Sequence, residues 1–412
     1  MAKLGSLFDG AGTMPYAAEL SGIEPVWSSE IESFPLKVTA KRFPNVTQLG
    51  DITKIDGRKI EPVDVITFGS PCQDLSIAGK RAGLDGERSG LFMEAVRIIK
   101  EMRDETSTGA DESVRPRFAV WENVPGAFSS NKGEDFRVVL EETCKIKDGN
   151  AAVPRPKGGK WNTAGLIVGD GYSVAWRVLD ARFWGVPQRR RRIWLVADFG
   201  GERAGEILFK RAGLRRSFAS SRASREEVAR DFGNGAQAAD RKICEANGFN
   251  HLNGSKAKSI AYTENGSPTL RAGSPTSCVV FFGQDAYDKY TETQQSATIK
   301  ASGGIYGGAC LVCAGFSPQA GKTAGISYSV NESPTLQTSK EMGMVIGRES
   351  QYIVRRLTPL EYCRLQGMPD WWCADVLHSD APEYKMWGNG MALPCATYVM
   401  EGIAEIFEKE KA

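Results

Sequence analysis

Short apolar runs alternate with amphipathic segments over the first half of the chain. Each run has the length of a buried strand and ends at a polar or glycine-containing loop; the runs are KLGSLF, EPVWSSE, DVITF, RFAVWE and RRIWLVAD. Between them, residues 34–43 and 91–102 carry apolar positions at helical spacing. Strands that alternate with helices predict an α/β fold, with a mostly parallel sheet covered by helices on both faces.

The pattern changes after residue 199. Residues 200–240 are rich in arginine and serine, which is typical of a solvated linker or a segment that contacts phosphates. Residues 250–350 have weak helical periodicity, and three similar β-prone units begin there at Ser259, Gln295 and Ile326. We expect a small β-rich domain of repeated hairpins, which either is only a fold element or also carries a recognition surface.

The α/β character returns after residue 352. A helix is expected to begin after Pro359, and a final helix places Ala396, Val399, Ile403 and Ile406 on one apolar face. Such a face should pack back onto the first domain. The first domain, residues 1–199, would then be completed by residues 352–412, with residues 200–351 inserted between them.

Composition narrows the class of protein. A chain of 412 residues suggests two or three domains, and a net charge of +2 excludes a polycation, so nucleic-acid binding would need local basic patches. No apolar run approaches the about 18 residues that span a bilayer, and the first residues do not form a secretory signal. Nine cysteines without an export signal predict free thiols in a reducing cytoplasm, and no metal site is expected.

Several chemically distinctive residues fall where strands end, which is where open α/β sheets bind ligands. FDGAG follows the first strand, Glu30 ends the second, and Asp51 follows the next helix. Pro15 and Tyr16 occupy the region of the third glycine of a dinucleotide motif, so an adenosine-containing cofactor other than NAD is favoured. Each residue alone would equally suit a turn or a helix cap.

Cys72 and Glu122 follow two further strands. Cys72 lies in GSPCQDLS, displayed on a loop rather than inside the strand, and Glu122 begins the ENV segment. Neighbouring parallel strands would bring both over one pocket. Because His251 and His378 lie outside the strand-end motifs, a Cys-His hydrolase is disfavoured. The structural alternative is a buried cysteine on a turn.

Four arginines lead into the strand RRIWLVAD. Arg190 and Arg192 would share one face and contact phosphate or a base, or simply form a charged strand entrance. Arg88 lies at the far end of a glycine-rich loop after Cys72, and this loop could close over a substrate.

The motifs FDGAG, SEIE, GDI, GSPCQ, ENV, QRRRR, RRLTPLE, RLQGMPD and WGNG occur in the order of the cytosine-5 DNA methyltransferase family, which the chain resembles over residues 1–199 and 352–405. The resemblance implies a Rossmann-like fold that binds S-adenosylmethionine, with a β-rich target-recognition domain inserted into it. It implies transfer of a methyl group to C5 of a flipped-out cytosine in a specific double-stranded DNA sequence.

The resemblance also assigns residues. Phe8 would pack on the adenine, Glu30 would bind the ribose and Asp51 the adenine amino group. The full set implied for the cofactor is Phe8, Gly10, Gly12, Glu30, Ile31, Asp51, Ile52, Pro71 and Asn389. Where members of the family commonly have a serine–valine pair after this asparagine, the chain has Gly390 and Met391.

For catalysis, the resemblance implies that Cys72 attacks C6 of the cytosine and that Glu122 stabilises the ring at N3. Arg190 would hold the base and polarise its carbonyl, and Arg192 would belong to the same catalytic group. The residues implied for gripping the DNA are Gln73, Ser76 and Arg88.

Two alternatives remain open, a tRNA cytosine-5 methyltransferase and a catalytically silent DNA-binding homologue. On the main interpretation the partner is double-stranded DNA, the enzyme is a monomer, and a cognate restriction endonuclease would act separately. It would work in the cytoplasm of a bacterium or phage-infected host, associated with the nucleoid through its DNA. A restriction, phage-protection or orphan role is compatible with this interpretation.

Overall fold

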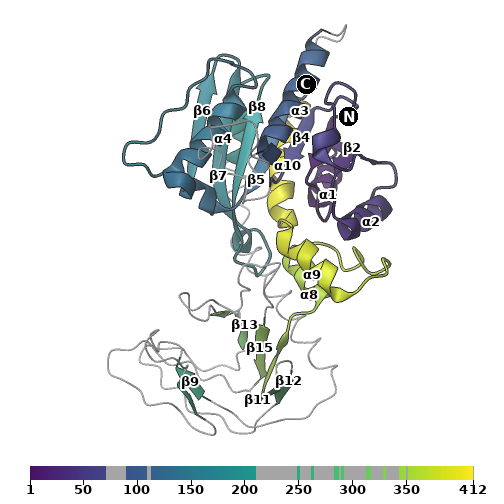
Figure 1. The fold of residues 1–412 in the computed structure, drawn as a ribbon, viewed down its shortest axis with the longest axis vertical. Helices are drawn as coiled ribbons and strands as arrows, with labels where there is room; N and C mark the ends of the chain where they lie inside the picture. Colours follow the sequence, from purple (N-terminus) through teal and green to yellow (C-terminus); the bar gives the residue numbers. More distant parts are fainter. Residues whose placement is uncertain are drawn as a thin grey trace.

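A computed structural model describes residues 1–70, 90–108, 113–209 and 357–411 in full. Between residues 210 and 356 it describes only the backbone of short strands. The fold is organised around one eight-stranded sheet of order β3-β2-β1-β4-β5-β8-β7-β6 (Figure 1). The described helices include none that is long and apolar enough to cross a membrane.

Five neighbouring strands of the sheet are parallel, and the remaining three are added antiparallel. The parallel strands are β1 (Lys3–Leu7), β2 (Glu24–Ser29), β3 (Thr47–Gln48), β4 (Val65–Phe68) and β5 (Phe118–Asn123). The antiparallel additions are β8 (Arg191–Asp198), β7 (Tyr172–Asp180) and β6 (Ala164–Gly169). The five strands expected from apolar runs are confirmed. The hairpin β6–β7 was missed, and β6 is an edge strand whose residues are exposed or only half-buried.

Helices cover both faces of this sheet, as predicted. One face carries α3 (Gly90–Ser107) and α4 (Glu134–Cys144), and the other carries α1 (Thr13–Leu20), α2 (Ser33–Arg42), α5 (Ala204–Leu208) and α10 (Leu393–Lys411). Strand β5 shows why: Phe118 and Val120 enter the core with α1 and α10, while Ala119 and Trp121 enter the core with α3 and α4. The period of two along a strand divides the apolar residues between two cores.

The C-terminal segment returns to the first part of the chain. It contains α8 (Pro359–Leu365), α9 (Asp380–Asn389) and α10, and α8 begins with a capping box between Thr358 and Glu361. On α10 the four residues expected to face the core are all buried. Tyr398 donates a hydrogen bond to the carbonyl of Leu208, at 3.1 Å. The last helix therefore packs onto α1 and α5.

The inserted region contains antiparallel strands. β9 (Gly248–Asn250) pairs with β10 (Ala261–Thr263), and β11 (Gly283–Ala286) pairs with β12 (Lys289–Thr291). A four-stranded sheet follows, in the order β14 (Tyr328–Val330), β13 (Val312–Phe316), β15 (Gly343–Arg348) and β16 (Gln351–Arg356). β10 and β14 lie in two of the three β-prone units. The domain boundaries and the recognition role of this region remain predictions.

Candidate cofactor and catalytic site

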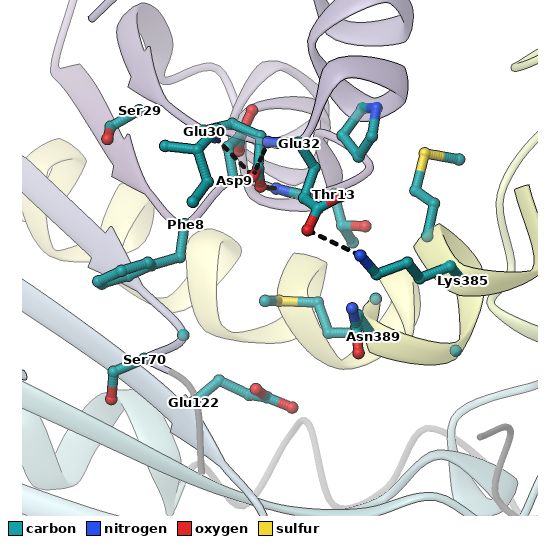
Figure 2. A pocket seen from close by; sticks show the side chains of 18 of the residues that line it. Phe8, Asp9, Thr13, Ser29, Glu30, Glu32, Ser70, Glu122, Lys385 and Asn389 are labelled. Carbon is teal, nitrogen blue, oxygen red and sulfur yellow. Dashed lines mark hydrogen bonds and ion pairs between the residues drawn. The ribbon is translucent and has the colours of Figure 1, made fainter. Parts of the chain in front are cut away.

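A cavity of about 710 Å³ lies at the carboxyl ends of the parallel strands. Its walls come from the segments after β1, β2, β4 and β5, and α9 with the segment after it closes another side (Figure 2). This volume is within the range of about 300–1,000 Å³ typical of sites for small molecules and cofactors. The location is the one predicted from the strand-end residues.

Glu30 holds the first wall together. Its Oε2 accepts a hydrogen bond from the amide of Gly10 at 2.8 Å, which ties the turn after β1 to the end of β2. Its Oε1 accepts from the amides of Ile31 and Glu32, at 2.7 and 2.9 Å. Phe8, beside this turn, has a left-handed backbone with φ of 55°. Strained backbone at a cavity wall suits close approach of a ligand.

Gly12 does not line the cavity, contrary to the expectation for a cofactor-binding glycine. It precedes α1 with φ of 77°, and an added Cβ would lie 2.8 Å from Phe43 and 3.5 Å from Trp372. Trp372 also donates its indole hydrogen to the carbonyl of Ala11 at 2.8 Å. The glycine is needed here because the aromatic side chains pack closely against the turn. Gly10, in contrast, does line the cavity.

Asp9 is a wall residue that sequence reasoning did not single out as a site residue. Its side chain is buried, and Oδ1 accepts a hydrogen bond from the hydroxyl of Ser6 at 2.7 Å. Oδ2 finds no hydrogen-bond partner among the described residues. Burial raises the pKa of the Asp9 carboxyl to about 7. An orphaned carboxyl oxygen at a cavity wall fits a site completed by a polar ligand.

Asp51 lies on the same cavity. Its Oδ1 accepts hydrogen bonds from the amide and the hydroxyl of Thr53, at 3.0 and 2.8 Å. The amide hydrogen bond is the main cause that lowers the pKa of this carboxyl, so Asp51 remains an ionised acceptor. The two neighbouring isoleucines expected at the cofactor, Ile31 and Ile52, also line the cavity, the first largely exposed and the second buried.

Helix α9 supplies the opposite wall. Asn389, its last residue, lines the cavity as expected. Lys385 lies one turn earlier on α9, and its Nζ is 2.7 Å from Oε1 of Glu32, an ion pair that joins the two walls (Figure 2). Lys385 was also missed, although its spacing of four from Asn389 places both on one helix face.

The part of the cavity where catalytic residues are expected is built on β5. Trp121 donates its indole hydrogen to the hydroxyl of Ser70 at 3.1 Å, and the Asn123 side-chain amide donates to the carbonyl of Ser70 at 3.0 Å. Because β4 and β5 are parallel neighbours, these contacts hold Ser70, two residues after the end of β4, at the cavity wall. Sequence reasoning predicted this juxtaposition of the two strand ends but not its hydrogen bonds.

Glu122 is buried in this wall with 8% of its surface exposed. Nε of Arg192 lies 3.0 Å from its Oε1, as an ion pair rather than a well-aligned hydrogen bond. Burial raises the pKa of Glu122, and the positive charges of Arg192 and Arg190 oppose that rise. The side chain is thus suited to hold a proton and share it with a bound ligand.

Arg190 has a different environment from the one expected. Its side chain is 2% exposed, and its Nη2 donates hydrogen bonds to the carbonyls of Gly388, at 3.2 Å, and Gly390. The guanidinium that pairs with Glu122 belongs to Arg192. Arg190 also lines the cavity, and its expected role at the base remains a prediction.

Five expected site residues lie outside the described residues, in the segment 71–89: Pro71, Cys72, Gln73, Ser76 and Arg88. Their placement remains a prediction. The last described residue before this segment along the chain is Ser70, which is buried at the cavity wall.

Relatives of the chain are methyltransferases. A DNA N-6-adenine-methyltransferase of Escherichia phage P1 is 29% identical over 99% of this chain, which spans 62% of that relative's length. The type II methyltransferase M1.ScrFI of Lactococcus lactis subsp. cremoris is 26% identical, with 99% of this chain and 79% of the relative covered.

Solved structures share the fold. The Dnmt2 methyltransferase of S. pombe matches with a TM-score of 0.51 at 13% identity, covering 100% of both chains. The methyltransferase EhMeth of Entamoeba histolytica matches with a TM-score of 0.50 at 12% identity, covering 99% of both chains. These likenesses support the expected S-adenosylmethionine-dependent methyltransferase fold. A family model matches residues 2–146 and 167–405, so the chain belongs to the C-5 cytosine-specific DNA methylase family.

Proposed function

We propose that this protein transfers a methyl group from S-adenosylmethionine to C5 of a cytosine in a specific double-stranded DNA sequence. The observation that carries the proposal is the buried Glu122–Arg192 pair. It shares a cavity with acceptors suited to an adenosine group and lies beside the strand that leads to Cys72.

The cofactor end of the cavity fits this methyl donor. S-adenosylmethionine is the cofactor of the family and, when bound, supplies an electrophilic methyl group and becomes a neutral thioether. Phe8 would pack against its adenine ring, Glu30 would accept from its ribose, and Asp51 would accept from its adenine amino group. Asn389 would contact it from α9. All four side chains line the one cavity.

Cys72 is proposed as the nucleophile. Its thiolate forms a bond to C6 of the cytosine, and the electron pair of the C5–C6 double bond is released toward C5 while N3 takes a proton from Glu122. C5 then takes the methyl group. Its proton leaves to water, the C6–sulfur bond breaks to return the thiolate, and N3 gives its proton back to Glu122. The cysteine and the carboxyl are both regenerated.

The arginine at the base is proposed to be Arg192. Its side chain already lies against Glu122. A cytosine whose N3 contacts Glu122 would therefore place its neighbouring C2 carbonyl beside Arg192. Arg192 would hydrogen-bond the carbonyl at C2 and stabilise the charge that develops when Cys72 adds. A base within a duplex is stacked on both faces, so the target must first be flipped out of the helix.

DNA contacts are proposed for two segments. Gln73, Ser76 and Arg88 would grip the phosphates and fill the gap that the flipped base leaves. Residues 200–351 would read the target through base edges in the major groove, while their basic residues set the register on the phosphates. A cognate restriction endonuclease, phage protection and an orphan role are all compatible with this activity.

The decisive experiment is expression in a host that lacks DNA cytosine methylation, followed by mapping of both 5-methylcytosine and N6-methyladenine. We expect 5-methylcytosine at one or a few sequence motifs and none in a Cys72→Ser variant. Methyladenine without methylcytosine would contradict the proposal and favour the activity named for the phage P1 relative. Modification of host tRNA in place of DNA would instead support the tRNA alternative.

A second measurement tests the covalent step. Duplex DNA that carries 5-fluorocytosine at the mapped target should trap the wild-type protein, because fluorine at C5 cannot leave as a proton does. The trapped complex should survive denaturing electrophoresis. An equally abundant adduct with Cys72→Ser would show that another residue is the nucleophile.

A further inference from the structure

Arg190 is placed at a junction between distant segments. It lies directly before β8, its carbonyl accepts a hydrogen bond from the amide of Ala181 at 3.0 Å, and its side chain is almost fully buried. Its Nη2 reaches the carbonyls of three consecutive residues, at 3.2 Å for Gly388, 3.5 Å for Asn389, and closer for Gly390. One guanidinium thus gathers the backbone around Asn389.

These carbonyls form the C-terminal end of α9. The last carbonyls of a helix lack partners within the helix and carry its negative partial charge, so a cation there satisfies both needs. Arg190 is therefore a side-chain cap for α9, supplied from nearly two hundred residues earlier in the chain. Because Asn389 is the last residue of α9, this cap sets where its side chain stands in the cavity.

Two further buried contacts lie near this junction, one between the two segments and one within the C-terminal segment. The Gln188 side-chain amide donates to the carbonyl of Leu365 at 2.9 Å, and that of Gln366 donates to the carbonyl of Trp387 at 2.6 Å. Both side chains are fully buried. The segment that contains Arg190 is thus fastened to the C-terminal segment at more than one point, and the junction is well defined.

The other neighbour of Arg190 is the base end of the cavity. Arg192 lies two residues along and pairs with Glu122, and all three residues line the cavity that Asn389 enters (Figure 2 shows Glu122 and Asn389). The two guanidinium groups repel one another, and the carboxylate attracts both. With Arg190 held by the carbonyls after α9, Arg192 is the arginine left to pair with Glu122.

We propose that Arg190 is a positioning residue that links the cofactor end and the base end of the cavity. Its role is to hold other residues in place through the backbone after α9. By capping α9 it sets Asn389 for the cofactor, and because its Nη2 is bound to the carbonyls after α9, Glu122 pairs with Arg192. The inference rests on the proposed function of this cavity. It predicts that substitution of Arg190 weakens both cofactor binding and catalysis at the base. Substitution of Arg192 should affect catalysis at the base alone.

The test uses the full chain and the product analogue S-adenosylhomocysteine as the probe. Isothermal titration should show at least tenfold weaker binding by Arg190→Lys, because a compact ammonium cannot span three carbonyls as a guanidinium does. Arg192→Lys, the matched change two residues away, should bind the probe within twofold of wild type. Equal binding by wild type and Arg190→Lys would overturn the inference.

A double-mutant cycle separates positioning from general damage. Asn389→Ala alone should weaken binding of the probe, and Arg190→Lys with Asn389→Ala should weaken it little further, because the cap acts through Asn389. Additive losses would contradict the proposal. If Arg190→Lys does not fold, as judged by near-ultraviolet circular dichroism, Arg190→Met avoids a buried unpaired charge and serves in the same cycle.

Kinetics on unmethylated genomic DNA supply the remaining readout. For Arg190→Lys we expect a raised KM for S-adenosylmethionine together with a lowered kcat, and for Arg192→Lys a lowered kcat with KM nearly unchanged. A wild-type protein that does not bind S-adenosylhomocysteine at all would overturn the proposed function itself. A wild type that binds it, with an unaffected Arg190→Lys, would overturn only the linking role.

Discussion

The residues at the cavity fall into two groups. Some have hydrogen-bond partners close in the sequence, and others have partners from distant segments. Glu30 and Asp51 take most of their hydrogen bonds from amides within two residues, so their acceptor role follows from the local turn. Glu122, Asp9 and Arg190 depend on burial and on partners from other segments. Their chemistry is set by the environment and can be altered one side chain at a time.

Glu122→Gln should separate proton transfer from binding. A neutral amide has nearly the same shape but cannot give a proton to N3, so kcat should fall by about 10²–10⁴-fold. Binding of S-adenosylhomocysteine should be unchanged. Because burial raises the pKa of Glu122, the protonated form persists to higher pH than usual, and the wild-type rate should decline as pH rises through that pKa.

Measurement of initial rates from pH 5 to 9 checks this expectation. Glu142→Gln on α4, which lies away from the cavity, is the matched control and should keep the wild-type profile. A Glu122→Gln protein with more than half the wild-type rate would show that the carboxyl does not act on the base.

Asp9 should make the stability of the protein depend on pH. The unfolded chain releases this proton near pH 4, whereas the folded protein keeps it up to about pH 7. The proton retained by the folded protein raises the free energy of unfolding at low pH. As pH rises from about 4 to about 7, this contribution is lost, and the free energy of unfolding falls by roughly 4 kcal/mol in all. Asp9→Asn should remove this decline.

Urea denaturation between pH 4 and pH 8 is the measurement. Asp9→Asn should be more stable than wild type at pH 8, with the difference shrinking toward pH 4. Asp170→Asn, at the exposed turn between β6 and β7, makes the same change of charge and should follow wild type. An Asp9→Asn protein with the wild-type pH dependence would refute the assignment.

At the scale of elements, α10 is the helix that packs the C-terminal segment against the rest of the protein. Its buried face lies against α1, α5 and the sheet, and Phe407 packs edge-on against Phe118 of β5 at 5.4 Å between ring centroids. The spacing of three and four residues predicted this face from sequence. The strand runs predicted most of the sheet in the same way, while the hairpin β6–β7 escaped because an edge strand need not be continuously apolar.

Ile403→Ala should test α10 directly. Ile403 is fully buried, so the truncation leaves a cavity and should lower the free energy of unfolding by about 2–5 kcal/mol. Glu408→Ala on the exposed side of the same helix should cost less than about 0.5 kcal/mol. Urea denaturation with a common m-value gives both numbers. Similar losses for the two variants would mean that α10 does not hold this core together.

At the scale of the whole molecule, one core unites the two ends of the chain. Leu4 and Val65 from the first strands share it with Trp372, Tyr398 and Ile403 from the last segment. The cavity at the strand ends is also built from both parts of the chain, because its walls come from the strand ends and from α9. Neither part alone therefore has a complete core or a complete site.

Fragment complementation should reveal this division. Residues 1–209 expressed alone should be poorly folded and should not bind S-adenosylhomocysteine, since α8–α10 no longer cover one face of the sheet. Co-expression with residues 352–412 should restore a measurable part of both properties. Thermal unfolding with and without the probe is the measurement. A fragment 1–209 that folds and binds with wild-type affinity would contradict the shared core and site.

The sequence by itself determined what depends on neighbours along the chain. Period-two apolar runs set the strands and hence the edge of the sheet where the cavity lies, and the ordered motifs indicated the family that the comparison confirmed. Only the tertiary structure decided which arginine meets Glu122, that Gly12 packs against Phe43, and that Asp9 is buried with an orphaned oxygen. These properties arise from contacts between segments up to several hundred residues apart. Burial and charge at such contacts change a side chain's chemistry without leaving any pattern in the sequence around it.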